Sequence, residues 1–201
     1  MPPRVSNGHG TDRRILEAAT ELFSEKGYHG TSMREVASVV GIRAASLYNH
    51  YPGKEDLLVR IAAGVMEELL AGGRLAIGEH REPAARLRAL IVWHVTYHAE
   101  QRLRARIADE QLHAISPERR EAVLAVRDAY TELFKDILAE GRTRCAWRVP
   151  SISVLTFGIG GMCTFVDTWY REDGLLGPAE IAGMYADFIL TGLGDGNRPS
   201  R

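Results

Sequence analysis

Apolar residues recur at three- and four-residue intervals along most of the chain, which is the spacing of one helix face. The first stripe runs from Ile15 to Phe23. Thr11 is a suitable N-cap for this helix, and Gly27 is expected to close it. The same spacing returns in every later segment, so the pattern predicts an all-α protein.

The stretch Ser32–Tyr51 predicts two short helices joined by a tight turn. Ser32 and the glutamate three residues later form a capping box, which starts the first helix. Gly41 can adopt the left-handed backbone that turns the chain sharply. The second helix, about Arg43 to Tyr51, buries only Leu47. Because it is too polar for a core helix, we expect it to enter a DNA major groove.

The body of the chain is predicted to consist of further helices. Lys54 opens one that ends at Gly72–Gly73, and these glycines and residues 78–83 are expected to be hinge points. The remaining predicted helices run from Pro83 to a kink near Gln101, from Arg102 to Ile115, from Pro117 to Gly141, from Ser151 to Tyr170, and from Gly177 to Leu193.

The last two predicted helices carry unusual amounts of apolar surface. Ser151–Tyr170 has few polar faces, so we expect it to be buried on several sides. A membrane span is the alternative, but Asp167 and five Ser/Thr positions argue against it. Together with Gly177–Leu193 this surface exceeds what one chain can cover, which predicts a homodimer built on these two helices.

Three glycines lie inside the apolar run, at Gly158, Gly160 and Gly161. A nucleotide-binding glycine loop would follow a strand, and no strand is predicted here. We therefore interpret them as positions of close helix contact.

Composition narrows the possible functions. The 201 residues are 45% hydrophobic and 25% charged, which indicates an ordinary globular protein, with a formal net charge of -1. Up to Lys54 there are seven basic residues against five acidic ones, so any DNA contact must come from a local patch. Cys145 and Cys163 form no metal-ligand spacing and suit a reducing cytoplasm. Because residues 1–10 form a polar, Pro/Gly-containing segment, we expect no signal peptide there.

Residues 14–58 resemble the TetR family of transcriptional regulators. The matching residues are Ala18-Ala19, Leu22-Phe23, Gly27-Tyr28, Gly30-Thr31-Ser32, Glu35-Val36-Ala37, Gly41-Ile42, Leu47-Tyr48, His50-Tyr51 and Lys54-Glu55-Asp56-Leu57. The resemblance implies a three-helix DNA-binding domain over 11–56, with the helix-turn-helix at 32–51. A helical ligand-binding and dimerisation domain would follow over 57–194, and 1–10 and 195–201 would be tails.

The resemblance also implies which residues contact a double-stranded operator. Those expected to face base edges are Arg43, Ala44, Ala45 and Ser46. Those expected to face the phosphate backbone are Thr31, Ser32, Tyr48, His50, Tyr51 and Lys54. The family often has Ser or Thr where Arg43 stands, so this chain gives up a helix cap and gains a guanidinium that suits guanine. Arg4, Arg13 and Arg14 form either a second basic contact or an ordinary solvated face.

Large adaptable side chains in the second half suit an apolar effector pocket with a few polar anchors. The candidate pocket residues are Trp93, His94, Tyr97, His98, Glu110, Tyr130, Phe134, Gly161, Met162, Phe165 and Trp169. The pattern Trp169-Tyr170, Gly174-Leu175, Glu180-Ile181-Ala182 is similar to TetR-type regulators of fatty-acid and steroid catabolism that respond to acyl-CoA thioesters. We therefore expect a cytoplasmic repressor, released from a palindromic operator by a small apolar or acyl-CoA-type effector.

Two alternatives remain. His94 and His98 stand one helical turn apart and could hold a metal ion, with Glu110 or His113 as a third ligand, which would make a metal-responsive regulator. A helical enzyme is the other alternative. Against it, the sequence has no nucleophile elbow, no paired-carboxylate motif and no phosphate loop, and neither cysteine lies near a predicted base. No cofactor is expected.

Overall fold

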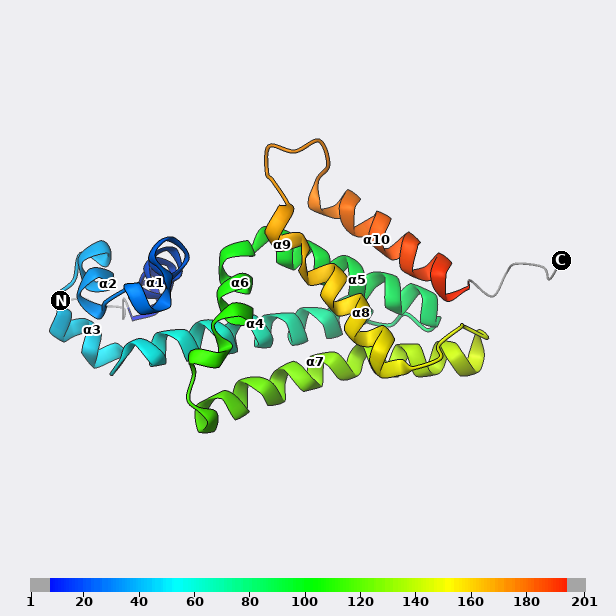
Figure 1. The fold of residues 1–201 in the computed structure, drawn as a ribbon, viewed down its shortest axis with the longest axis horizontal. Helices are drawn as coiled ribbons and strands as arrows, with labels where there is room; N and C mark the ends of the chain where they lie inside the picture. Colours follow the sequence, from blue (N-terminus) through cyan, green and yellow to red (C-terminus); the bar gives the residue numbers. More distant parts are fainter. Residues whose placement is uncertain (1–7, 195–201) are drawn as a thin grey trace, which may run out of the picture. The chain divides into compact units, whose positions relative to one another are not determined.

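The computed structural model describes residues 8–194, and within that range the regular structure is helical (Figure 1). The helices are α1 Gly8–Gly30, α2 Met33–Val40, α3 Ala44–His50, α4 Lys54–Ile77, α5 Pro83–Glu100, α6 Arg102–Glu110, η1 Leu112–Ala114, α7 Pro117–Arg144, α8 Ile152–Thr164, α9 Val166–Trp169 and α10 Pro178–Leu193. The all-α prediction is confirmed. The predicted tail residues 1–7 and 195–201 lie outside the described residues.

The chain forms two compact units. Unit 1 contains the residues up to Val65 together with Leu103–Val123, and unit 2 contains Met66–Arg102 together with Leu124 onward. α4 and α7 each run from one unit into the other without interruption. Unit 1 holds the predicted helix-turn-helix, and unit 2 holds most of the predicted pocket residues.

Unit 1 is built on the apolar stripes that the sequence displays. Ile15, Val36 and Leu47, one from each of the first three helices, are fully buried. The first helix begins at Gly8, three residues before the predicted Thr11. Its regular part breaks at Gly27 (φ 76°, ψ 158°), where glycine avoids the clash that a Cβ would cause.

Gly72–Gly73 and Gly141 were predicted to end helices, but they lie inside them. α4 continues through Gly72 and Gly73 to Ile77, so the predicted hinge there is wrong. A Cβ on Gly72 would lie 2.0 Å from the ring of Trp93. In the same way α7 passes Gly141, where a Cβ would lie 1.9 Å from Trp147. These glycines make room for indole rings. The interpretation of them as helix ends missed this role.

Two predicted helices are shorter than expected. α6 ends at Glu110, and η1 replaces the stretch predicted to continue to Ile115. The apolar run 151–170 divides into α8 and α9, with Phe165 between them. The single helix predicted over 151–170 is therefore interrupted at Phe165.

In unit 2, α10 packs along α5, and α8 and α9 also contact α5 (Figure 1). One face of α8 and α10 stays uncovered, so the expectation that 151–170 is buried on several sides is wrong for the single chain. The exposed apolar side chains on these helices include Val154, Phe157, Phe165, Trp169, Met184 and Phe188. A Cβ on Gly158, Gly160 or Gly161 would find no neighbour within 4 Å, so the chain itself makes no close helix contact at these positions.

Candidate functional site

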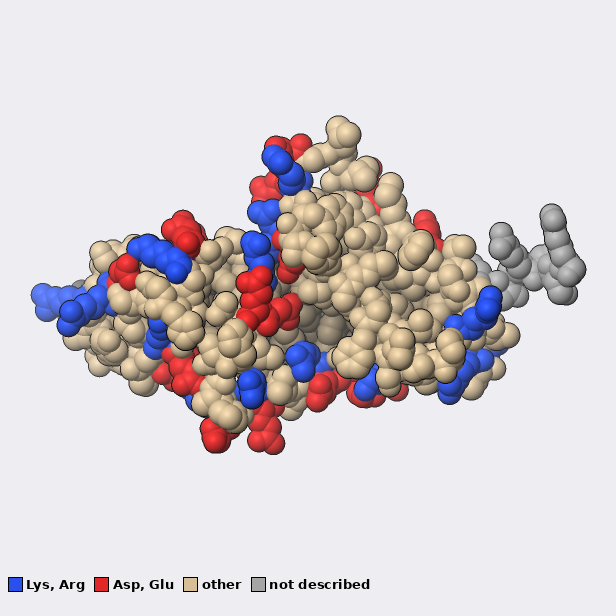
Figure 2. All heavy atoms as spheres, viewed as in Figure 1, with Lys and Arg blue, Asp and Glu red and all other residues tan. Residues whose placement is uncertain are grey.

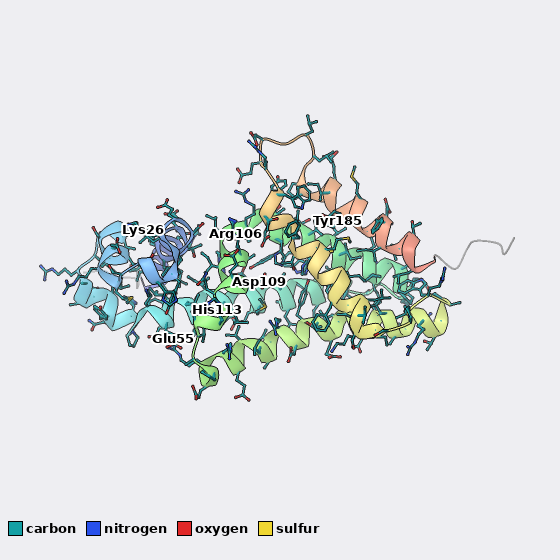
Figure 3. The ribbon with its side chains drawn as sticks, viewed as in Figure 1. Lys26, Glu55, Arg106, Asp109, His113 and Tyr185 are labelled. Carbon is teal, nitrogen blue, oxygen red and sulfur yellow. The ribbon has the colours of Figure 1, made fainter. Side chains whose placement is uncertain are left out.

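The helix-turn-helix is held by local hydrogen bonds that its sequence prescribes. The backbone N–H of Ser32 donates to Glu35 Oε2 (2.8 Å), and the N–H of Glu35 donates to Ser32 Oγ (3.3 Å). Lys26, labelled in Figure 3, donates to Glu35 Oε1 (2.7 Å). The hydrogen bonds from Lys26 and then Ser32 lower the pKa of Glu35 to about 2. Gly41 (φ 74°, ψ 34°) then ends α2 in the left-handed conformation, as predicted.

The recognition helix α3 presents almost all its side chains to solvent. Leu47 is buried, Ala44 is partly exposed, and the other residues of α3 are exposed. Arg43 occupies the N-cap, is exposed, and makes no capping hydrogen bond with its side chain. Figure 2 shows Lys and Arg side chains projecting from the α2–α3 end of unit 1. This surface can meet a groove and its phosphates.

Three residues predicted to contact phosphate have side chains that bond to other parts of unit 1. Thr31 is buried, and its hydroxyl donates to the carbonyls of Leu22 and Gly27 (3.1 and 3.0 Å). Tyr51 is buried and donates to a carboxylate oxygen of Asp12 (2.5 Å).

Lys54 is the third of these residues. Its ammonium donates to the carbonyls of Tyr28 (2.6 Å) and Thr31 (2.8 Å), and it lies 4.5 Å from the centre of the Tyr28 ring. These contacts satisfy carbonyls at the end of α1. Ser32, Tyr48 and His50, which were also predicted to contact phosphate, are exposed.

The two described arginines before the motif, Arg13 and Arg14, also have partners within unit 1. Arg14 donates to the carbonyl of Val40 at the end of α2 (2.6 Å), and Arg13 pairs with Glu17 on the same helix (2.7 Å). Arg4 lies outside the described residues. Arg14 is thus a helix cap rather than a free basic contact.

A buried polar cluster occupies the interior of unit 2. The two ring nitrogens of His94 lie 3.0 Å from the hydroxyl of Tyr130 and 3.0 Å from that of Thr164. His94 also stacks on His98, with ring centres 4.4 Å apart. Burial, and then the neighbouring His98, lower the pKa of His94 well below its ordinary value. His94 is therefore a neutral hydrogen-bonding group inside the unit.

The sequence interpretation missed two members of this cluster. Thr164 bonds His94, and the buried Asp167 has a carboxylate oxygen 4.0 Å from His98 Nδ1. Nδ1 of His98 is buried without a hydrogen-bond partner among the described residues. Asp167 is a charged residue inside an apolar run, and this was the signal in the sequence that could have revealed the cluster.

The predicted pocket residues do not form one set. Six of them lie on α5 and α7 in unit 2 and are buried or partly buried: Trp93, His94, Tyr97, His98, Tyr130 and Phe134. Trp93 donates to the carbonyl of Leu69 (3.0 Å), and Tyr97 donates to Glu68 (2.8 Å). These contacts attach α5 to the second half of α4.

The other predicted pocket residues lie elsewhere. Glu110 belongs to unit 1 and is exposed. Gly161, Phe165 and Trp169 lie on the exposed face of α8 and α9, because that face points away from α5. Met162 lines a surface groove of about 310 Å³ between α8 and α10, together with Arg148, Leu155, Gly158, Ile159, Phe188, Ile189, Gly192 and Leu193. These residues therefore do not join the buried cluster around His94 in the single chain.

The geometry also disfavours His94 as a metal ligand, and with it the predicted His94–His98 pair. Both ring nitrogens of His94 are already hydrogen-bonded, so neither is available as a ligand. His113, like Glu110, is exposed and lies in unit 1.

Comparison with known families agrees with both halves of this description. Residues 15–61 match the family described as bacterial regulatory proteins, tetR family, and residues 80–193 match the tetracyclin repressor-like C-terminal domain. The chain belongs to the TetR family. Members of this family are DNA-binding transcriptional regulators rather than enzymes, and so is this TetR-family protein.

Similar proteins cover nearly the whole chain. The transcriptional repressor KstR2 of Rhodococcus jostii is 27% identical over 96% of this chain and 97% of its own. The solved structure of PfmR from Thermus thermophilus is 33% identical, covers 90% of this chain and 98% of its own, and gives a TM-score of 0.82. AibR, solved with isovaleryl coenzyme A and operator DNA, is 25% identical, covers 89% and 97%, and gives 0.78.

Family membership also bears on the apolar run. Within residues 8–194, Ile152–Trp169 is long and apolar enough to cross a membrane by length and composition alone. These residues lie within 80–193, which match the tetracyclin repressor-like C-terminal domain, so they are helices of that domain rather than a membrane span.

Proposed function

We propose that this TetR-family protein is a cytoplasmic homodimeric repressor, released from a palindromic operator by an acyl-CoA-type effector. The exposed recognition helix carries the DNA-binding part, because α3 buries only Leu47 and leaves its remaining surface free for a major groove. Residues 11–56 read the operator, and 57–194 bind the effector and form the dimer.

The DNA contacts follow from exposure. Arg43, Ala44, Ala45 and Ser46 begin the recognition helix and face base edges. Tyr48 and His50, later in α3, and Ser32, at the N-cap of α2, face the phosphate backbone. The helix-start amides of α2 and α3 add phosphate contacts without adding net charge. This compensates for the modest surplus of basic residues in the first 54 positions.

The effector part rests on the interior of unit 2 and on a relative. The buried polar cluster around His94, which includes Tyr130 and Thr164, lies among aromatic and apolar side chains, the composition of small-molecule sites. AibR was solved with an acyl-CoA, and the present chain covers 97% of it. An acyl-CoA is therefore the effector class that we propose.

The dimer part rests on the uncovered face of α8 and α10. Phe157 and Phe188 are 73% and 71% exposed, and Figure 2 shows this face as a broad area nearly free of charged side chains. Single soluble chains rarely expose a patch of this kind. A second copy would cover it through a four-helix seam, and would supply the neighbours that Gly158 and Gly161 lack.

The experiment is an operator titration. Operator is first recovered by selection from a random duplex pool, and its binding is measured with isovaleryl-CoA, palmitoyl-CoA, free CoA and the free acids. Release by an acyl-CoA, with no effect of CoA or the free acid, supports the proposal. If neither acyl-CoA changes the operator affinity, the proposal that the effector is an acyl-CoA is refuted.

A further inference from the structure

Three consecutive side chains in the first turn of α4 bind two different parts of unit 1. Lys54 donates to the carbonyls of Tyr28 and Thr31, which connect α1 to α2. Glu55 and Asp56 instead contact the start of α7. The turn therefore joins the DNA-reading helices to a second long helix.

The contacts between α4 and α7 use both backbone and side chain. The backbone N–H of Ser116, directly before α7, donates to Glu55 Oε1 (2.8 Å). One terminal nitrogen of Arg119 lies 2.6 Å from Asp56 Oδ1, and the other lies 3.7 Å from Glu55 Oε2. Figure 3 labels Glu55 at this junction. We call Glu55, Asp56, Ser116 and Arg119 the α4–α7 clamp.

The clamp is partly shielded from solvent. The side chains of Arg119, Glu55 and Asp56 are 37%, 32% and 26% exposed. Hydrogen bonds from Ser116 are the largest influence on Glu55 and lower its pKa, so the carboxylate is charged at neutral pH. An arginine shared by two carboxylates fixes direction better than a single exposed ion pair does.

α7 connects the clamp to the interior of unit 2. It is one helix from Pro117 to Arg144, with no proline or glycine between Pro117 and Gly141. Tyr130 lies eleven residues after Arg119, or about 16 Å along the axis, and its hydroxyl bonds His94. A displacement at Tyr130 would therefore reach the clamp through continuous helix.

We propose that α7 is a route by which effector binding reaches the helix-turn-helix α2–α3, and that Arg119 is the residue that positions α4 against α7. The proposal rests on the proposed function and deepens it by naming the helix that transmits the effector signal. It means that a change at Tyr130 alters operator affinity only while the α4–α7 clamp is intact.

The test is a double-mutant cycle on operator affinity, and it needs no effector. Tyr130→Phe removes only the hydroxyl that bonds His94, and is expected to change the operator Kd about 2- to 30-fold. In an Arg119→Ala background the same substitution should change the Kd by less than about 1.5-fold.

Arg120→Ala is the matched control, since it removes the adjacent arginine of the same turn and should preserve the full effect of Tyr130→Phe. The exchanged pair Arg119→Asp with Asp56→Arg should restore it, which a general loss of stability at Arg119 would not allow. Circular dichroism and thermal unfolding establish that each variant is folded.

Either of two results overturns the proposal: Tyr130→Phe leaves operator affinity unchanged in the wild-type background, or its effect persists in Arg119→Ala. Failure of the proposed function is separate, because it appears in the wild type alone, as absence of operator binding or of release by isovaleryl-CoA and palmitoyl-CoA.

Discussion

Arg43 is the residue on which operator choice should depend most. It is exposed at the start of α3, and its side chain makes no capping hydrogen bond there. We predict that Arg43→Ala costs about 1 to 3 kcal/mol at the selected operator and relaxes sequence preference. Competition between operator and scrambled duplex checks this. Equal weakening on both duplexes would instead place Arg43 on phosphate.

Lys54 should behave as a structural residue. Its ammonium is held by the carbonyls of Tyr28 and Thr31, so Lys54→Met leaves them without their charged donor. We predict a loss of about 1 to 3 kcal/mol in the free energy of unfolding. The salt dependence of operator binding should stay at the wild-type slope, whereas loss of a phosphate contact would lower that slope by about one. The exposed Arg34→Ala is the control for stability.

His94 should make unit 2 sensitive to acid. Because burial lowers its folded pKa, the unfolded chain takes up a proton near pH 6.5 while folded His94 stays neutral. Stability is therefore full above that pH and is lost as the pH falls, by up to about 1.4 kcal/mol per pH unit. Denaturant unfolding at several pH values should show a smaller loss for His94→Asn than for wild type. The exposed His80→Asn should keep the wild-type loss, and an equal loss in His94→Asn would refute the assignment.

Residue type alone could not separate DNA contacts from supports. Thr31, Tyr51 and Lys54 have side chains that suit phosphate, and only the fold shows that carbonyls and Asp12 already occupy them. The exposed positions of α3 were predictable, because a helix with one buried leucine has to present its other residues outward. The sequence therefore identified the exposed surface of α3, but not the intrachain partners of Thr31, Tyr51 and Lys54.

At the scale of helices, starts were easier to predict than ends. Ser32, Pro83 and Pro117 begin or cap helices through local chemistry that the sequence displays. Gly72 and Gly141 resemble terminators, but they accommodate Trp93 and Trp147, which are distant in sequence. The break between α8 and α9 likewise lies where Thr164 and Asp167 approach the histidines of α5. Such contacts depend on packing that periodicity does not reveal.

The exposed face of α8 and α10 should form the dimer. Phe188 is 71% exposed on this face, so Phe188→Asp should weaken self-association by at least about 30-fold, roughly 2 kcal/mol. Leu75→Asp is the matched control, because Leu75 is 82% exposed on α4, outside the face. Sedimentation equilibrium measures both, with circular dichroism to confirm folding. A dimeric Phe188→Asp beside a monomeric Leu75→Asp would place the interface elsewhere.

At the scale of the whole molecule, the proposed dimer would present two copies of α3 to its operator. A dimer fits a palindromic operator only when its two recognition helices meet successive major grooves, so a small change in their separation is enough for release. AibR was solved with an acyl-CoA and operator DNA in one complex, which makes the sign of the ligand effect the decisive quantity.

The most direct measurement is therefore the dissociation constant of the wild-type dimer for its selected operator, with and without saturating acyl-CoA. We predict two chains per duplex and a Kd raised about 5- to 150-fold by the acyl-CoA, with free CoA inactive. A Kd that is unchanged or lowered by every acyl-CoA bound would contradict release by this class of effector.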